Sequence, residues 1–227
     1  MKITDKLKTF TASDKDRALG DIAICDGTAY ATDGRIAFAV KLDEPHADEI
    51  PGGYPIGALK GVLAEPDACT PWSTIDPEAF KALDENFKAL MRQKMIEGNN
   101  DYNDRYNEMT CPCCGGKLYY DTWEDKLVEE REKKPDFDAR DVEHSLRIEF
   151  DNGEAANINF CYLHMIWSAF GPDLLFAAGQ MKESKNRLLF VRSKDGRIRG
   201  IVMWIVVLAG DKTKCTIAAK TAEGRAE

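Results

Sequence analysis

The stretch that most constrains the fold of this chain is residues 17–42, RALGDIAICDGTAYATDGRIAFAVKL. β-formers alternate with other residues on both sides of Asp26-Gly27, and an Asp-Gly pair supplies the positive φ values that a tight hairpin turn needs. We therefore expect two antiparallel strands joined at Asp26-Gly27. Asp33-Gly34 interrupts the alternation within the second strand, which predicts a bulge or a turn that directs Arg35 sideways from the sheet.

Other stretches predict further strands and three helices. Asp76-Pro77-Glu78 marks a helix start, because an Asp cap, a first-turn proline and an acid favour helix initiation. We expect that helix to end at Gly98. Residues 162–170 read as an apolar helix stopped by Gly171-Pro172, and 127–134 as a short charged helix. The expected strands are 3–12, 145–150, 154–160, 174–178, 187–192 and 197–208.

Two groups of residues, one near each end, form a pattern known from one protein family. The first group is Arg17, Leu19, Ile24 and the segment ATDGRIAFAV at 31–40. The second runs from Ile158 to Leu163 and continues with Phe170-Gly171-Pro172, Leu188-Leu189-Phe190, Asp195-Gly196 and residues 200–203. In this order they resemble a domain of the bacterial DNA sliding clamp, the ring-shaped processivity factor of replicative polymerases.

The resemblance implies an α+β fold, a DNA-clamp-like domain of antiparallel sheets with packed helices. That domain would comprise residues 1–97 and 146–208, with 98–145 as an inserted acidic segment and 209–227 as a flexible tail. It also implies a non-enzymatic protein of DNA replication that binds double-stranded DNA and replication proteins; a phage origin is one alternative. A ring needs several such domains, so the chain either forms a homo-oligomer or has kept the fold without the ring.

Basic residues on the predicted elements are the candidate DNA contacts. The family places a basic residue that faces DNA at the position of Arg35. Lys15 and Arg17 follow Ser13, which caps a predicted helical turn, and Lys81 and Lys88 lie on the helix that starts at Pro77. Clamp helices hold phosphates through such side chains without reading sequence. The alternatives are an Asp33–Arg35 surface pair and ordinary solvated cations.

A pocket for partner peptides is the other site that the resemblance implies. Sliding clamps hold such peptides near their last strands, which predicts Met203, Trp204 and Val206 as lining residues. Trp204 stands where the family commonly has a proline, so this chain departs from the pattern there.

The segment 111–117, CPCCGGK, predicts a zinc knuckle. Two thiolates separated by two residues, Cys111 and Cys114, can reach one tetrahedral ion, and the glycines let the backbone turn behind the second sulfur. No second CxxC completes the site. Cys161 and His164 have ligand spacing and would supply the other half; Cys113, Cys69 and His144 are the alternatives, and a knuckle without metal is another.

Composition bounds the function classes. The 227 residues carry a net charge of −8, and the stretch 91–145 holds −5 of it, with 9 basic and 14 acidic residues. This balance excludes a surface that is basic throughout, while a local basic face remains compatible with it. Seven cysteines, no signal-peptide pattern and no apolar run of membrane-spanning length predict reduced thiols in a cytoplasmic protein without a membrane partner.

Catalytic motifs are missing from the sequence. There is no GxSxG, phosphate-binding GxxxxGKS or HExxH segment, and the chain has three histidines in total. The rival interpretation to a clamp is therefore also a binding protein. It is a zinc-stabilised interaction module that binds a protein partner, such as host replication machinery, and not DNA.

Overall fold

The structure is a computed structural model that describes residues 2–12, 18–64, 68–110, 117–122, 126–128, 140, 144–180, 187–205 and 215–222. It divides into two compact units, residues 1–84 with 143–227, and residues 85–142. The chain combines helices with a large mixed sheet, which confirms the predicted α+β class.

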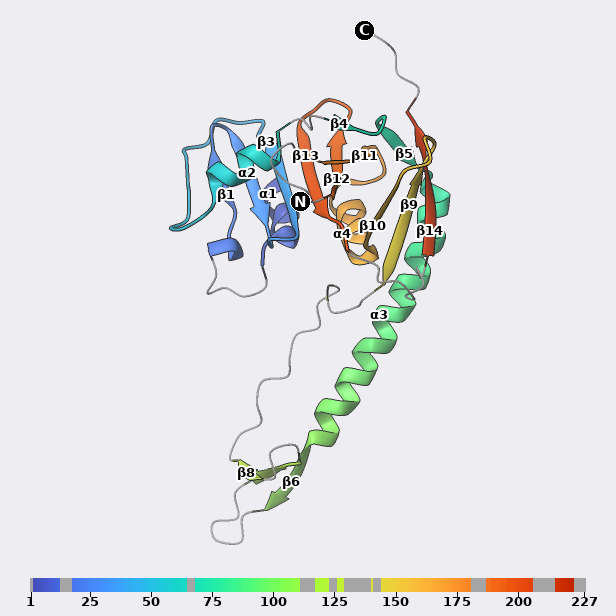
Figure 1. The fold of residues 1–227 in the computed structure, drawn as a ribbon. Coiled ribbons are helices and arrows are strands. Elements are labelled where there is room, and N and C mark those ends of the chain that lie inside the picture. The colour runs from blue at the N-terminus through green and yellow to red at the C-terminus, as the bar shows by residue number, and fades with distance from the viewer. Residues whose placement is uncertain are drawn as a thin grey trace. The chain divides into compact units, whose positions relative to one another are not determined.

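The first unit is built on one sheet, which has eleven strands within the described residues (Figure 1). Its strands run in the order β1 (Ala23–Cys25), β2 (Thr28–Thr32), β3 (Ile36–Lys41), β13 (Ile198–Met203), β12 (Arg187–Ser193), β11 (Leu174–Gln180), β5 (Ser73–Ile75), β14 (Cys215–Thr221), β9 (Ser145–Phe150) and β10 (Ala155–Asn159). β4 (Ala68–Cys69) also pairs with β11. All these pairings are antiparallel except that of β14 with β9.

The two distant ends of the chain meet where β3 pairs with β13, with Phe38 opposite Gly200. Helix α1 (Ile3–Leu7) and the 3-10 helices η1 (Lys8–Phe10) and η2 (Ala18–Gly20) precede the antiparallel strands β1, β2 and β3. Helix α4 (Phe160–Phe170) precedes the antiparallel strands β11, β12 and β13. The sheet therefore contains the same order of elements twice, helical residues followed by three strands.

Successive side chains of a strand point to opposite faces of the sheet. At β3, different elements pack on the two faces. Phe38 of β3 packs against Phe10 of η1 and Phe170 of α4, with ring centroids 4.6 and 5.1 Å away. On α4, Trp167 stacks on Phe80 at 4.0 Å, which fixes the start of α3 (Pro77–Arg105) beside α4. We call this side the helix-bearing face.

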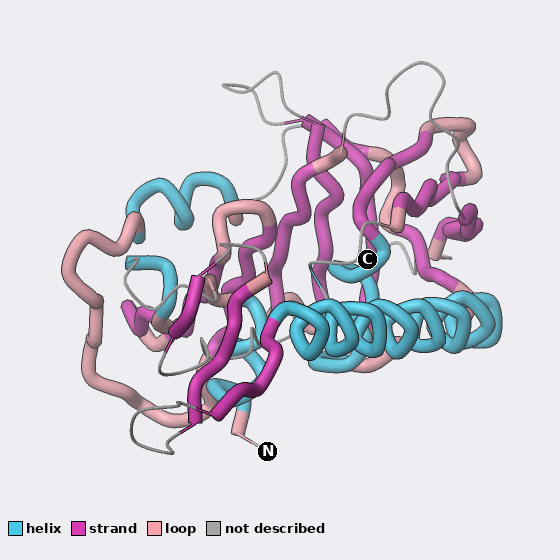
Figure 2. The backbone as a smooth tube through the Cα atoms, turned by 90° about the horizontal axis from the view of Figure 1, so that it is seen from below, coloured by secondary structure: helices cyan, strands magenta, loops and turns pink. Residues whose placement is uncertain are grey.

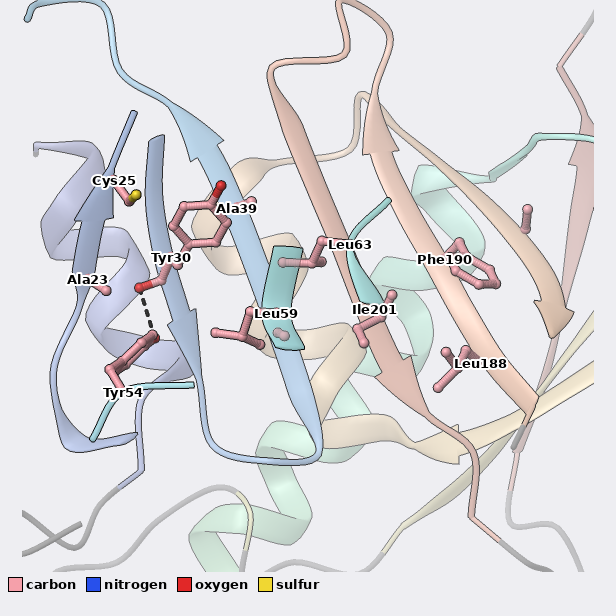
Figure 3. Close-up of a cluster of buried hydrophobic side chains, with 12 residues drawn as sticks. Ala23, Cys25, Tyr30, Ala39, Tyr54, Leu59, Leu63, Leu188, Phe190 and Ile201 are labelled. Carbon is pink, nitrogen blue, oxygen red and sulfur yellow. Dashed lines mark hydrogen bonds between the residues drawn. The ribbon is translucent and has the colours of Figure 1, made fainter. Parts of the chain in front are cut away.

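The other face of the sheet is covered by α2 (Ile56–Val62). Leu59 of α2 and Leu63 just after it belong to a buried cluster with Ala39, Phe190 and Ile201 (Figure 3). Tyr54, just before α2, donates a 3.0 Å hydrogen bond from its hydroxyl to the Tyr30 carbonyl. Burial raises the pKa of Tyr54, so this donor stays protonated. The segment between β3 and β4, in which the sequence predicts no helix, thus closes this side of the core.

Several predicted boundaries are confirmed by backbone geometry. Asp26 and Gly27 have φ of 50° and 65° and join β1 to β2 in a tight hairpin. Asp76 accepts a hydrogen bond from the Glu78 amide at 3.0 Å, as a helix cap does. Gly171, with φ of 79°, ends α4, and its amide donates to the Trp167 carbonyl at 2.8 Å.

Four predictions about elements are wrong. Residues 3–10 are helical, because Ile3, Leu7 and Phe10 recur at helical spacing. Helix α3 continues past Gly98 to Arg105, since one glycine costs a helix only about 1 kcal/mol. Residues 126–128 form strand β8, where a helix over 127–134 is predicted; residues 129–134 lie outside the described part. Residues 215–221 form a strand instead of a flexible tail, and Ile217 and Ala219 are buried on one side of it.

The second unit contains a separate sheet of three antiparallel strands within the described residues, β6 (Tyr106–Thr110), β7 (Lys117–Asp121) and β8 (Lys126–Val128) (Figure 2). Its sheet is tied to the end of α3. The Asp121 carboxylate, 2% exposed, pairs with the Arg105 guanidinium at 2.5 Å, and the Thr122 amide donates to the Arg105 carbonyl at 2.8 Å.

Candidate nucleic-acid interface and partner pocket

Arg35 lies in a tight turn between β2 and β3 that two side chains hold in place. The Thr32 hydroxyl accepts from the Gly34 amide at 3.0 Å and donates to the Ile36 carbonyl at 2.7 Å. One Asp33 carboxylate oxygen accepts from the amides of Arg35 and Ile36 at 2.8 and 3.0 Å. The sequence predicts a bulge or a turn here, and the structure has a turn, with the Arg35 side chain exposed.

Arg35 also contacts α4 through Tyr162. The pKa of Tyr162 is raised to about 12, mainly by burial and next by the negative charge of Asp33, while a hydrogen bond with Arg35 acts in the lowering direction. Tyr162 is 4% exposed, so it offers Arg35 a fixed partner. The predicted contact residue is thereby held beside the first turn of α4, on the helix-bearing face.

The other predicted DNA contacts are spread over several elements. Lys81 is exposed near the start of α3. Lys88, in the second unit, is half-buried and its ammonium lies 3.6 Å from Glu85. Lys15 and Arg17 lie outside the described residues. Exposed cations that sequence reasoning missed are Lys2 and Lys8, which flank α1.

Helix α4 offers no basic side chain for phosphate contacts. Its sequence contains no lysine or arginine, and Ser168 is its one exposed residue. The sheet and the start of α3 cover the rest. Cations that face a duplex on this side must therefore come from the β2–β3 turn, the N-terminal helices and the start of α3.

Of the three residues predicted to line a partner pocket, Trp204 lines a cavity at the end of β13. Trp204 lines a cavity of about 230 Å³ together with Cys69, Glu154, Gln180 and Arg187. The Arg187 guanidinium lies over the Trp204 ring, 5.2 Å from its centroid, and the indole nitrogen is buried without a hydrogen-bond partner among the described residues. Met203 is 38% exposed, and Val206 lies outside the described residues. The cavity is thus more polar than the hydrophobic pocket that the resemblance implies.

Cys161 and His164 occupy successive turns of α4. Cys161 is fully buried, and its amide donates to the Asn159 side chain at 3.3 Å. The His164 Nδ1 lies 2.5 Å from an Asp84 oxygen, with the two side chains 17% and 10% exposed. Such a carboxylate fixes the orientation of the imidazole, which suits a metal ligand and equally suits a structural pair.

The remaining predicted ligands are divided between described and undescribed parts. Cys111, Cys113 and Cys114 lie outside the described residues. Cys69 is exposed on β4, and the His144 amide donates to the Asn159 side chain at 3.3 Å. The ligand set of the predicted zinc knuckle therefore stays a prediction.

A different group, missed by sequence reasoning, can hold a metal. The ligand atoms of Cys25, Asp26 and Asp48 lie within 4.8 Å of one another. The Lys60 ammonium, however, lies 2.7 Å from Asp26 and 3.2 Å from the Cys25 sulfur. Its hydrogen bond is the main cause of a lowered pKa at Asp26, and Asp26 in turn is the main cause of a raised pKa at Lys60. The Lys60 ammonium thus already contacts two of the three possible metal ligands, Asp26 and Cys25.

No helix of the described residues is long and apolar enough to span a membrane. Comparison of the chain with protein-family models, curated proteins and solved structures gives no match.

Proposed function

We propose that this protein is a non-enzymatic, sliding-clamp-like protein of DNA replication that tethers replication proteins to double-stranded DNA. The observation that carries the proposal is the pairing of β3 with β13. These strands come from the two segments whose residues resemble a sliding clamp, and they are more than 150 residues apart in the chain. Their direct pairing is what a single clamp-type domain requires.

The layer of helices supports the same proposal. In a clamp, the sheet forms the outer wall and helices face the DNA. Here η1, α4 and the start of α3 are linked to one face of the sheet through aromatic contacts. Arg35 is exposed at this face and is held by a fixed turn. A cation presented from a rigid element can contact phosphate without contacting the bases, as sliding demands.

A ring would have to be assembled from copies of this chain, because the first unit supplies one clamp-like domain. Strand pairing between subunits at sheet edges is the expected mode of closure. Within the described residues, β1 and β10 are the terminal strands of the sheet. The Ile24–Glu49 bridge on β1 and the Ile205 amide bonded to the Asn157 carbonyl cover part of these edges. Ring closure would then use the backbone N–H and C=O groups of β1 and β10 that these contacts leave uncovered.

Duplex binding should weaken steeply with salt. About four phosphate contacts, from Arg35, Lys2, Lys8 and Lys81, would make log K fall against log salt with a slope of about −3.6. Replacing Arg35 with alanine should weaken binding at all sequences alike and reduce that slope by about 1. Fluorescence anisotropy of a labelled duplex over a salt series measures both quantities.

Arg147→Ala is the matched control, since Arg147 is a half-buried arginine of β9 whose guanidinium pairs with Glu149 at 2.8 Å. It removes the same charge and should keep the slope of the unchanged protein. Absence of salt-dependent duplex binding by the unchanged protein would refute the DNA-tethering proposal. Equal slopes of log K against log salt for the Arg35 and Arg147 variants would show that Arg35 does not contact DNA.

The zinc-stabilised interaction module is the second candidate function. What favours it is the pairing of Thr110 with Lys117, which makes residues 111–116 the connection between two antiparallel strands. A short connection of this kind carries both thiols of the CxxC pair. A module of this type would bind a protein partner tightly and leave DNA unbound, so the salt series separates the two candidates.

Metal analysis identifies which cysteines bind zinc. We expect about one zinc ion per chain, because a four-coordinate structural site binds a single ion. Cys111→Ser and Cys114→Ser should each abolish it, because a structural site does not tolerate the loss of a thiolate. Cys161→Ala and His164→Ala test the second half of the site in the same assay.

Cys25→Ala is the control, since Cys25 lies in the group that already contains the Lys60 ammonium. Retention of zinc in the Cys111 variant together with its loss in the Cys25 variant would show that the metal is bound by Cys25, Asp26 and Asp48 instead. Absence of zinc from all preparations would support the alternative of a knuckle without metal.

A further inference from the structure

A cavity of about 290 Å³ opens on the α2 side of the sheet, and its wall is cationic. Four of its lining residues are basic, Lys41, Lys60, Arg197 and Arg199, and none of the described lining residues carries a carboxylate. Thr28 and Tyr30 add hydroxyl groups. Such a concentration of one sign of charge is unexpected in a chain with a net charge of −8.

Strand register brings the cations together. Lys41 pairs with Thr28, and Arg199 pairs with Ala39, whose side chain belongs to the cluster under α2. Side-chain alternation therefore puts Lys41, Ala39 and Arg199 on the same face. The last turn of α2 adds Lys60, and the Arg197 guanidinium donates to the Lys41 carbonyl at 3.2 Å. The sheet and α2 thus fix the positions of the donors.

Two of the cations already have carboxylate partners outside the cavity wall. Asp26 pairs with Lys60 and Asp43 pairs with Arg197, and these acids are 75% and 79% exposed. Ion pairs at such exposure contribute little to stability, because water screens both charges. An anion with several charges can therefore recruit the same ammonium and guanidinium groups without a large cost for separating the pairs.

The neighbouring hollow limits what the cavity can hold. It shares Leu63, Ala64 and Arg199 with the cationic cavity but has a volume of about 20 Å³, room for about one water molecule. The Arg192 guanidinium stacks over the Trp72 ring at 4.1 Å in this hollow. A ligand is therefore confined to the cationic cavity, with no space for a ring beside Trp72.

We propose that this cavity binds a phosphorylated small molecule, up to about a mononucleotide in size. Phosphate oxygens accept charge-assisted hydrogen bonds from guanidinium and ammonium groups, and several such donors converge here. The site lies on the face of the sheet that α2 covers, whereas α4 lies on the helix-bearing face. It is therefore independent of the proposed DNA contacts.

Isothermal titration at low salt tests the proposal with two probes, inorganic pyrophosphate and deoxyadenosine monophosphate. We expect saturable binding of at least one probe with one site per chain. Arg199→Gln and Lys41→Gln should each weaken it about tenfold or more, the loss expected for a hydrogen bond to a charged group. Because Lys41 is exposed, its variant stays informative if the Arg199 variant folds poorly.

Arg147→Gln is the matched control and should bind like the unchanged protein. Failure of both probes to saturate, or equal affinity in the Arg199, Lys41 and Arg147 variants, would overturn the proposal. A single-stranded oligonucleotide is the third probe. If only the oligonucleotide binds, and binds less well to the Arg199 variant, the cavity recognises a nucleic-acid strand and the small-molecule proposal is wrong.

Discussion

Gly200→Ala is expected to destabilise the first unit by about 3 kcal/mol, at the upper end for overpacking a core. A Cβ at this position would lie 2.3 Å from the nearest carbon of the Phe38 ring and 2.5 and 2.6 Å from two others. Phe38 is fully buried between Phe10 and Phe170, so its ring has no free direction in which to move. Denaturant unfolding followed by tryptophan fluorescence measures the loss.

Gly57→Ala is the matched control, because a Cβ at Gly57, within α2, meets nothing within 4 Å. It should be neutral or stabilise by up to about 1 kcal/mol, the helix preference of alanine over glycine. Adding Phe38→Leu to Gly200→Ala removes the clashing ring and should restore part of the stability. An unchanged unfolding midpoint for Gly200→Ala would show that β3 and β13 are not paired in this register.

The second large effect is expected from Asp121→Ala in the second unit. This change leaves the Arg105 guanidinium, 12% exposed, without the carboxylate that now accepts three of its hydrogen bonds. Breaking a buried ion pair from one side costs about 3 kcal/mol. Hydrogen exchange over residues 117–122 should accelerate on the order of a hundredfold, since each factor of ten corresponds to about 1.4 kcal/mol.

Lys117→Ala provides the comparison within the same sheet. Its ion pair with Glu108 spans 2.8 Å, but the side chains are 71% and 48% exposed, so its loss should cost under about 1 kcal/mol. The double change Arg105→Met with Asp121→Leu should recover much of the lost protection, because an apolar pair replaces a buried ionic one. Equal exchange in the Asp121 and Lys117 variants would contradict a structural role for the buried pair.

Elements whose signal is local could be predicted from the sequence. Asp26-Gly27 defines a hairpin by its own conformational preference, and the Asp76 cap and Gly171 determine helix ends through bonds to residues within four positions. β14 could not be predicted in this way. Its small side chains carry a weak pattern, and it becomes a strand through pairing with β5 and β9, which are distant in sequence.

The candidate sites also differ in whether their signal lies in one segment or comes from residues distant in the sequence. The turn that presents Arg35 could be predicted, because its signal, Asp33-Gly34, lies in one short segment, whereas the contact of Arg35 with DNA stays a proposal. The four cations of the α2-side cavity come from β3, α2 and the residues at the start of β13, and their spacing in the sequence carries no signal. The same holds for Lys60 beside Cys25 and Asp26, since 34 residues separate Asp26 from Lys60.

Hydrogen exchange with and without a short duplex at low salt shows whether the helix-bearing face holds duplex DNA. We expect slower exchange for residues 8–10 and 33–36 and at the start of α3 when the duplex is bound, with α2 unchanged. Protection confined to α2 and the β12–β13 turn, or no protection anywhere at saturating duplex, would contradict this expectation.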